Sequence, residues 1–114
     1  MNIKRGEIYL ASLDPVVGRE ISRTRPVVIV SNDKNNEFSG TVTILPITSK
    51  NLRKVYPFEM FLSKGAGNLP KNSKVKADQI RTLDKSRIVT LIGKLEEGRM
   101  VEIENAIKIH LAIH

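Results

Sequence analysis

Cysteine is absent from this chain of 114 residues, and histidine occurs only at positions 110 and 114. The lack of cysteine excludes disulfide scaffolds, thiol catalysis and zinc sites with cysteine ligands. Two histidines at the far C-terminus leave little from which to build a metal site or a histidine-based catalytic centre, so we expect neither a metal nor a cofactor. A chain without cysteine also fits a reducing compartment, and we expect a cytoplasmic protein.

Long apolar runs are lacking as well. The longest aliphatic stretch covers residues 27–30, far short of the roughly 18 residues that suggest a membrane span. The basic pair Lys4 and Arg5 is not followed by the apolar segment of a secretory signal. We therefore expect no membrane association, and the length and the 40% hydrophobic content fit one domain over residues 1–114.

Positive charge is unevenly distributed. The formal net charge is +7, and residues 50–76 hold seven basic residues against one acidic residue, Glu59. The basic residues of this stretch are Lys50, Arg53, Lys54, Lys64, Lys71, Lys74 and Lys76. Residues 1–49 and 77–114 are close to balanced. A local excess of this kind favours binding to a polyanion, and nucleic acid is the leading partner class.

The first three quarters of the chain has the patterns of β-strands. Alternation predicts a strand at about residues 5–13, and the β-branched run at 26–31 predicts a central strand covered on both faces. Further strands are expected at 41–48, 57–62, 73–79 and 88–95. Pro46 has no amide hydrogen, so we expect it at the end or the edge of its strand.

Turn chemistry separates these strands. Turns are expected at 32–36 and 39–40, and a loop at 65–68. Thr82 or Asp84 is a candidate cap of a short helical turn.

One amphipathic helix is expected from residue 97 onward. Apolar residues there recur at steps of three and four, at Met100, Ile103, Ile107 and Leu111. A second apolar row, Ala106, Ile109 and Ile113, fits either deep burial or contact with a partner. The predicted fold is mainly β (α+β), a small, strongly curved, barrel-like antiparallel sheet closed by a C-terminal helix.

Two polar segments stand at the ends of predicted strands. Between Gly18 and Pro26 the chain has three arginines and Glu20. Pro26 restricts the backbone of Arg25, which argues against a loosely held surface charge. The alternative is a solvated salt bridge of Glu20, worth about 0–1 kcal/mol. The second segment, residues 46–50, carries two hydroxyls and a lysine that suit a phosphate.

A third polar segment covers residues 76–81. In an extended strand Lys76 and Asp78 would share one face, with Gln79 on the other. Gln79 is able to read a base edge through paired hydrogen bonds. An ordinary polar strand face is the alternative and the more common outcome.

Five segments in order resemble the MazF/PemK toxin family. They are residues 5–9 (RGEIY), 14–18 (DPVVG), 25–30 (RPVVIV), 46–49 (PITS) and 78–87 (DQIRTLDKSR). The resemblance implies an SH3-like barrel of the CcdB/PemK type. It also implies a metal-independent endoribonuclease of a toxin–antitoxin pair that cuts single-stranded RNA at short sequences through the ribose 2′-hydroxyl, leaving a 2′,3′-cyclic phosphate and a 5′-hydroxyl.

Partners follow from the same resemblance. It implies a homodimer with RNA across the interface, a cognate antitoxin with an acidic, disordered tail, and DNA contacted through the toxin–antitoxin complex.

The resemblance assigns catalytic roles by position. Arg25 is expected to stabilise the pentacovalent phosphorus and to protonate the leaving oxygen, while Thr48 orients the phosphate. Glu20 is a candidate base or an orienter of Arg25, and Asp78 is its rival. RNA contacts are expected at Val17, Arg19, Ser49, Lys50, Tyr56, Ser73, Lys76 and Gln79, and the basic residues Arg53 and Lys54 are added to them. No cleavage sequence is predicted, because the loops at 15–24 and 50–57 differ most among relatives.

Two alternatives remain open on the sequence alone. A non-catalytic gyrase inhibitor on the same fold would act through its C-terminal residues and would not need Arg25 beside Thr48. A non-enzymatic RNA-binding barrel would use the basic stretch alone. Against the second, the five aromatic residues form no obvious base-stacking run; they are Tyr9, Phe38, Tyr56, Phe58 and Phe61.

Overall fold

The computed structural model describes residues 2–15, 17–20 and 23–114, so Ile21 and Ser22 of the arginine-rich segment lie outside the described residues, as do Met1 and Val16. The strands are β1 (Glu7–Ser12), β2 (Thr24–Ile29), β3 (Thr41–Thr48), β4 (Glu59–Leu62), β5 (Ser73–Lys76), β6 (Arg81–Asp84) and β7 (Ile88–Lys94). The α-helices are α1 (Asp33–Phe38) and α2 (Glu97–Leu111), and short 3-10 helices are η1 (Ala66–Asn68), η2 (Ala77–Gln79) and η3 (Lys85–Arg87).

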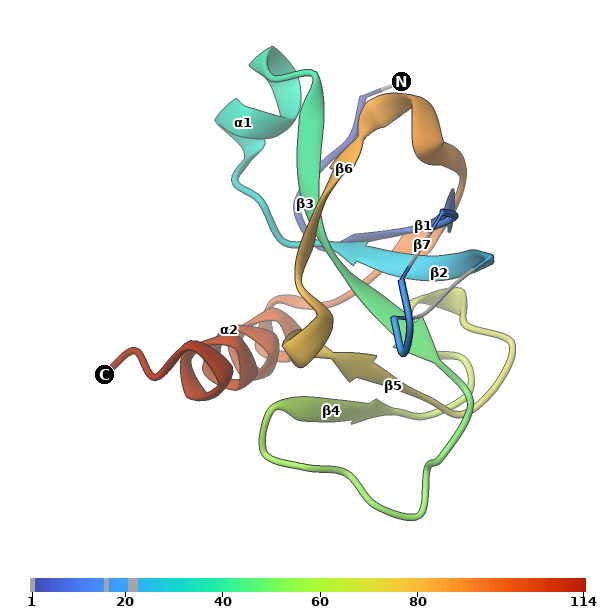
Figure 1. Ribbon diagram of the computed structural model, residues 1–114, viewed down its shortest axis with the longest axis vertical. Coiled ribbons are helices and arrows are strands. Elements are labelled where there is room, and N and C mark those ends of the chain that lie inside the picture. The colour runs from blue at the N-terminus through green and yellow to red at the C-terminus, as the bar shows by residue number, and fades with distance from the viewer. Residues whose placement is uncertain (1, 16, 21–22) are drawn as a thin grey trace.

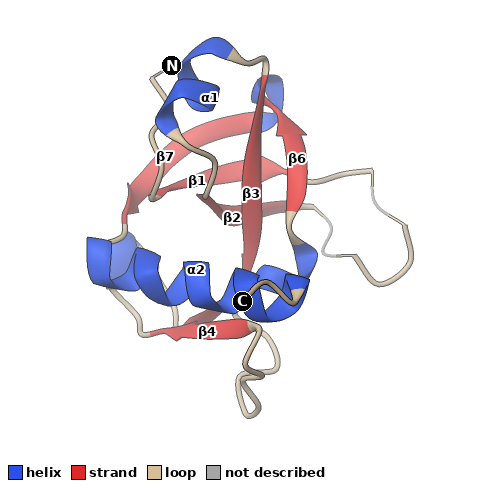
Figure 2. Ribbon diagram, turned by 90° about the vertical axis from the view of Figure 1, so that its left-hand side faces the viewer, coloured by secondary structure: helices blue, strands red, loops and turns tan. Residues whose placement is uncertain are grey.

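All strands join one antiparallel sheet in the order β4-β5-β3-β2-β1-β7, with β6 also paired to β3. The long strand β3 connects two halves of the molecule, because β6 lies along residues 41–44 and β5 along residues 47–48 (Figure 1). The predicted fold class is confirmed, but the barrel is not closed. Among the described strands, the end strands β4 and β7 do not pair, and α2 lies beside β4 at the open side (Figure 2).

The sheet separates two apolar layers. On one face, Ile8, Val28, Leu45 and Val75 pack in a cluster with α2, whose buried residues are Met100, Ile103 and Ala106. The other face carries a second cluster that includes Tyr9, Val27, Ile29, Val42, Ile44 and Leu83. Because successive strand residues point to opposite faces, a central strand buried on both sides must be apolar throughout. The predicted central strand is thereby confirmed, since Val27, Val28 and Ile29 are fully buried.

The prediction for Pro46 was wrong. Pro46 lies inside β3, opposite Val27 of β2. On the other side of β3, however, pairing with β6 ends at Ile44 and pairing with β5 begins at Ile47. The missing amide hydrogen therefore falls where the neighbouring strand changes, which is locally equivalent to an edge.

Two further boundaries differ from the predictions. The turn residues after β2 begin a helix, because the Asn32 side chain accepts a hydrogen bond from the Asn35 amide and caps α1. The strand expected at 73–79 ends at Lys76, where the chain bends through η2 so that β6 can pair with the other half of β3.

Two predictions near the C-terminus hold. The Asp84 side chain caps η3 by accepting a hydrogen bond from the Ser86 amide at 2.9 Å, as expected of a cap. Helix α2 begins at Glu97, as predicted. The apolar residues Ile109 and Leu111 in its last turn, and Ile113 after its end, are about half exposed.

Candidate functional site

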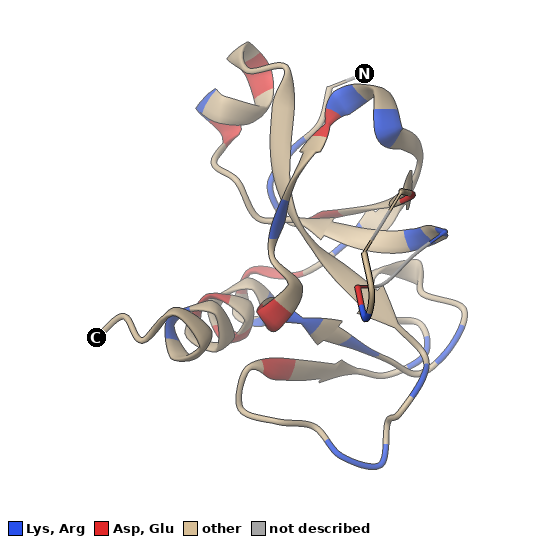
Figure 3. Ribbon diagram, in the orientation of Figure 1, with Lys and Arg blue, Asp and Glu red and all other residues tan. Residues whose placement is uncertain are grey.

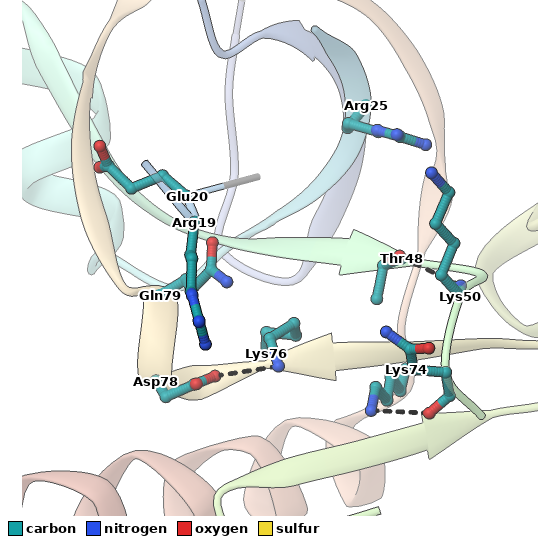
Figure 4. Close-up of a pocket in the computed structure, with 10 residues that line it drawn as sticks. Arg19, Glu20, Arg25, Thr48, Lys50, Lys74, Lys76, Asp78 and Gln79 are labelled. Carbon is teal, nitrogen blue, oxygen red and sulfur yellow. Dashed lines mark hydrogen bonds and ion pairs between the residues drawn. The ribbon is translucent and has the colours of Figure 1, made fainter. Parts of the chain in front are cut away.

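An open cavity of about 620 Å³ lies where the end of β3 meets β5, η2 and the loop between β1 and β2 (Figure 4). Its lining residues are Arg19, Glu20, Arg25, Thr48, Lys50, Asn51, Lys74, Lys76, Asp78 and Gln79. Eight of these were predicted as site residues from the sequence. Five of the lining side chains are basic and two are acidic, so the cavity is suited to an anion.

Sheet register explains why Arg25 and Thr48 lie together. Val27 is opposite Pro46 in the last register pair of β2 and β3, and Arg25 and Thr48 lie two residues beyond that pair on the two strands. Thr48 is in turn opposite Lys74 of β5. Because side chains alternate along each strand, Arg25 lies on the face of Val27 and Thr48 on the face of Pro46, so Arg25, Thr48 and Lys74 share one face of the sheet. Arg25 and Lys50 approach each other at one end of the cavity, and the Thr48 hydroxyl accepts a hydrogen bond from the Lys50 amide at 3.1 Å (Figure 4).

The floor of the cavity holds a buried ion-pair cluster built on Glu59. The Lys74 ammonium donates to one carboxylate oxygen of Glu59 at 3.1 Å, and Lys76 contacts the other oxygen. Lys74 also donates to the carbonyl oxygens of Asn51 at 2.9 Å and Lys54 at 3.1 Å. The side chains of Lys74 and Glu59 are only 5% and 1% exposed. Lys74 is thus a structural cation with all three of its donors used.

Charge in this cluster is stabilised by hydrogen bonds. Burial would raise the pKa of Glu59, but hydrogen bonds donated by Lys76, by the Tyr56 amide and by Lys74 outweigh it. The net effect holds the pKa of this carboxyl below its ordinary value, so Glu59 is ionised and compensates both lysines.

Asp78 carries an acceptor that the described residues leave unused. Its Oδ1 atom lies 3.6 Å from the Lys76 ammonium, which is beyond hydrogen-bond distance, and this buried atom has no hydrogen-bond partner there. Buried oxygens without a partner are uncommon in native proteins. Asp78 lines the cavity, so a ligand bound there would lie near this carboxylate.

Glu20 is held within its own loop. One oxygen of its carboxylate accepts a hydrogen bond from the Val17 amide at 2.5 Å. In Figure 4 the Glu20 side chain is directed away from Arg25, whereas Arg19 is directed toward η2. The structure therefore brings Glu20 to the rim of the cavity and Asp78 to its floor.

The remaining sequence-predicted residues lie outside the main cavity. Ser49 and Ser73 line a neighbouring cavity of about 180 Å³, which also includes Arg25. Ser73 is buried and donates its hydroxyl to the Lys71 carbonyl at 2.9 Å. The other four, Val17, Arg53, Lys54 and Tyr56, are exposed.

Two aromatic residues of the loop between β3 and β4 stack on each other. The rings of Tyr56 and Phe58 stack with centroids 5.2 Å apart, and the Lys54 ammonium lies 4.7 Å from the centre of the Tyr56 ring. Tyr56 is 42% exposed. The sequence argument against an aromatic stacking surface is therefore incomplete, because Tyr56 and Phe58 stack although they are separated along the chain by Pro57.

Sequence reasoning missed Asn51, Glu59 and Lys74 as site residues. Asn51 gave no signal, and Glu59 was noted only as the one acidic residue of the basic stretch. For Lys74 a signal existed, because Lys74 and Lys76 alternate with Ser73 and Val75 and so share one face of a strand.

The basic stretch is partly internal. Figure 3 shows lysine and arginine along the loop after β3 and along β5. Glu59 pairs with two of the seven basic residues of this stretch, so the exposed excess of charge is smaller than the sequence suggests. Over residues 2–15, 17–20 and 23–114 there is no group of three acidic or histidine side chains that could hold a metal ion. In the same residues, no helix has the length and apolar character needed to cross a membrane.

Comparisons with known proteins agree with one another. Residues 4–111 match the family described as the PemK-like, MazF-like toxin of type II toxin–antitoxin systems. The chain is 38% identical, over 96% of each chain, to a Mycobacterium tuberculosis protein named endoribonuclease MazF9.

Two solved structures are similar along nearly their whole length. A MazF from Deinococcus radiodurans has a TM-score of 0.84 and 26% identity over 98% of each chain. A mycobacterial endoribonuclease, solved in complex with its cognate antitoxin, has a TM-score of 0.77 and 22% identity, covering 99% of this chain and 96% of that one.

Proposed function

The chain belongs to the PemK-like, MazF-like family of toxins of type II toxin–antitoxin systems and is an endoribonuclease. We propose that it cleaves single-stranded RNA in the cavity between β3, β5 and η2. The observation that carries the proposal is that Arg25, Thr48 and Asp78 line one cavity with an excess of basic side chains. That set combines a phosphate-binding cation, a hydroxyl donor and an unused carboxylate oxygen.

The proposed reaction uses the RNA itself as the nucleophile. The ribose 2′-oxygen forms a bond to phosphorus while the bond from phosphorus to the 5′-oxygen breaks. A base takes the proton of the 2′-hydroxyl, and the leaving oxygen takes a proton, so the products are a 2′,3′-cyclic phosphate and a free 5′-hydroxyl. The protein must place these groups in line and stabilise the negative charge that builds up on the phosphoryl oxygens.

Arg25 and Thr48 bind the scissile phosphate in this proposal. A guanidinium fork binds two phosphate oxygens at once, and in this proposal Arg25 also donates the proton that the leaving 5′-oxygen takes and regains one from solvent. The Thr48 hydroxyl, on the neighbouring strand, fixes the orientation of the phosphate. One well-placed donor of this kind contributes about 10²–10³ in rate.

Asp78 is the better-placed base. Its Oδ1 atom is buried at the cavity and lacks a hydrogen-bond donor in the described structure, whereas a Glu20 oxygen already accepts the Val17 amide. Apo geometry often tightens when substrate binds, so Glu20 stays the second candidate. Replacing each by its amide separates them: the base gives the larger loss of kcat, and the other residue changes KM or nothing.

We propose that the reaction needs no metal or cofactor. Positive charge at the phosphate is supplied by Arg25, with Lys50 and Lys76 in the same cavity. These cations repel a divalent ion and supply the charge that would otherwise be needed at the phosphate (Figure 4).

The proposed partners follow from the family and the charge. A cognate antitoxin would inhibit the enzyme by laying an acidic, disordered tail into the basic cavity, in competition with RNA. The active form is proposed to be a cytoplasmic homodimer with RNA across its interface, and DNA would be contacted only through the toxin–antitoxin complex. A sedimentation experiment that finds a monomer at working concentration counts against the shared groove.

One experiment tests the central proposal. Purified protein is incubated with a randomised pool of single-stranded RNA in excess EDTA, and the fragment ends are analysed by mass. We expect fragments that end in cyclic phosphate with the wild type and with Lys34→Ala, an exposed charge control on α1, and none with Arg25→Ala. If Arg25→Ala loses RNA affinity and cleavage together, Arg25 mainly binds. RNA that the wild type binds but leaves intact would contradict cleavage and favour the non-enzymatic RNA-binding barrel.

A further inference from the structure

Glu59 reaches two parts of the candidate site at once. One oxygen of its carboxylate accepts hydrogen bonds from the Tyr56 amide and from Lys74, both at 3.1 Å. The other oxygen contacts the Lys76 ammonium on the floor of the cavity. With only 1% of its side chain exposed, Glu59 is itself out of reach of a large ligand. Any influence on RNA must therefore pass through the groups that it holds.

The first of these groups is the loop of residues 50–58, called here the clamp loop. Lys74 is opposite Phe61 of β4 and sends its ammonium to the carbonyl oxygens of Asn51 and Lys54. Glu59 fixes the other end of the loop at the Tyr56 amide. The clamp loop carries Lys50, which lines the cavity, and the half-exposed ring of Tyr56.

The second group is Lys76. Glu59 is opposite Lys76 in the β4–β5 register, so the ion pair is built into the pairing of the two strands. Asp78 lies on the other side of the same ammonium at 3.6 Å, too far for a hydrogen bond. Glu59 and Asp78 thus share the Lys76 ammonium, with Glu59 as the closer partner, and the buried Asp78 oxygen has no hydrogen-bond donor among the described residues.

We propose that Glu59 is a positioning residue of the RNA site, which holds the clamp loop with one carboxylate oxygen and the Lys76 ammonium with the other. This inference rests on the proposed function, since it assumes that RNA occupies the cavity. It assigns Glu59 a role that its charge alone would oppose, because a carboxylate beside a polyanion site lowers affinity through simple electrostatics.

Electrostatics and positioning predict opposite changes in RNA affinity when Glu59 is replaced, so Glu59→Gln distinguishes them. The variant adds one unit of positive charge, so electrostatics alone predicts tighter RNA binding. Positioning predicts weaker binding, because two ammonium groups lose their charged partner and the clamp loop loses an anchor. We expect the Kd for a randomised, 2′-O-methylated single-stranded RNA pool to rise about tenfold. The matched control is Glu37→Gln, which removes an exposed carboxylate on α1 and adds the same unit of charge.

Hydrogen exchange on the RNA-free protein supplies a readout that affinity alone does not give. In Glu59→Gln and in Lys74→Met we expect faster amide exchange in the clamp loop, with β1 and β2 unchanged. Lys74→Met leaves the contacts of Glu59 with Lys76 and the Tyr56 amide in place, so it remains informative if Glu59→Gln folds poorly. In the double variant Asp78→Asn, Glu59→Gln, the fold-loss of kcat should be smaller than the product of the fold-losses in the two single variants, because both substitutions act on the Asp78 oxygen.

The outcomes separate the two proposals. Wild-type protein that neither binds nor cleaves RNA overturns the proposed function and with it this inference. Wild-type protein that binds RNA, with Glu59→Gln binding as tightly or more tightly and the clamp loop equally protected in both variants, overturns the positioning role alone. Weaker RNA binding by Glu59→Gln, together with faster exchange of the clamp loop in Glu59→Gln and Lys74→Met and with Glu37→Gln unaffected, supports it.

Discussion

One face of the sheet has two halves with opposite character, although the same strands build both. Toward one end, Val27, Ile29 and Ile44 are fully buried in an apolar cluster. Toward the other end, Arg25 and Thr48 continue the same alternation on β2 and β3 but line an open cavity. The difference teaches that this site is not an addition to the fold. It begins where the apolar positions of an alternating pattern are replaced by polar ones at the strand ends.

The halves also differ in how their charges are handled. In the apolar half, the buried cluster contains one ionisable side chain, Tyr9, and the part-buried Arg81, opposite Ile44 on β6, donates a hydrogen bond to the Leu13 carbonyl at 3.2 Å. The polar half places three ionised side chains, Glu59, Lys74 and Lys76, in a largely buried cluster and leaves Arg25 and Lys50 facing the cavity. Stability and ligand binding should therefore respond separately to substitutions in the two halves.

The largest effect is expected from the apolar half. Ile44→Ala removes a fully buried side chain and leaves a cavity, so it should lower the free energy of unfolding by about 2–5 kcal/mol. RNA cleavage per folded molecule should not change, because Ile44 does not line the site. Urea unfolding with cleavage assayed at a temperature where the variant is folded checks both parts. A loss of specific activity without a loss of stability would contradict the expectation that the two halves respond separately to substitution.

The converse is expected of Thr48→Val in the polar half. The substitution keeps the shape and removes the hydroxyl, so cleavage should fall about 10²-fold through lost orientation of the phosphate. The free energy of unfolding should change by only about 1 kcal/mol, since the hydroxyl accepts one hydrogen bond, from the Lys50 amide. Thr82→Val on β6, where the side chain is exposed, is the matched control. Equal activity of Thr48→Val and wild type would remove Thr48 from the site.

A pH dependence of stability is expected from Glu59. Its folded-state pKa lies below the ordinary value of 4.5, so its contribution is fully present above about pH 4.5 and is lost as the pH falls through the folded-state pKa. The stability difference between wild type and Glu59→Gln should thus be largest near neutral pH and shrink in acid. Urea unfolding over a pH series tests this, and a difference that grows toward acid would contradict it.

The smallest effect is expected outside the cavity. Arg53 is exposed on the clamp loop, so Arg53→Ala should remove at most one phosphate contact. The slope of log K against log salt for single-stranded RNA should fall by about 0.7, and cleavage at saturating RNA should be unchanged. The affinity for single-stranded RNA, measured for both proteins over a series of salt concentrations, tests this slope. A large loss of kcat would place Arg53 in the catalytic half instead.

Much of the fold was predictable because it depends on local patterns. β-branched runs and alternation located the strands, and the change to steps of three and four located α2 at Glu97. The position of Pro46 was predicted wrongly because a proline fits inside a strand where no neighbouring strand needs its amide hydrogen. Beside β3 the neighbouring strand changes from β6 to β5 at that point, which only the tertiary structure shows. Likewise Asp78 and Gln79 were expected on a strand, but the bend at η2 follows from the requirement that β6 reach the far half of β3.

The sequence by itself determined which chemical groups are present: a basic stretch, three arginines before a buried strand, a hydroxyl pair after another, and no cysteine. It also determined which strand residues share a face, because alternation is a local property of the chain. Only the tertiary structure decided which of these groups meet. Whether a lysine faces RNA or serves as an internal cation depends on the strand opposite it, and for Lys74 that strand, with Glu59 and the clamp loop, comes from sequence positions 13–23 residues away.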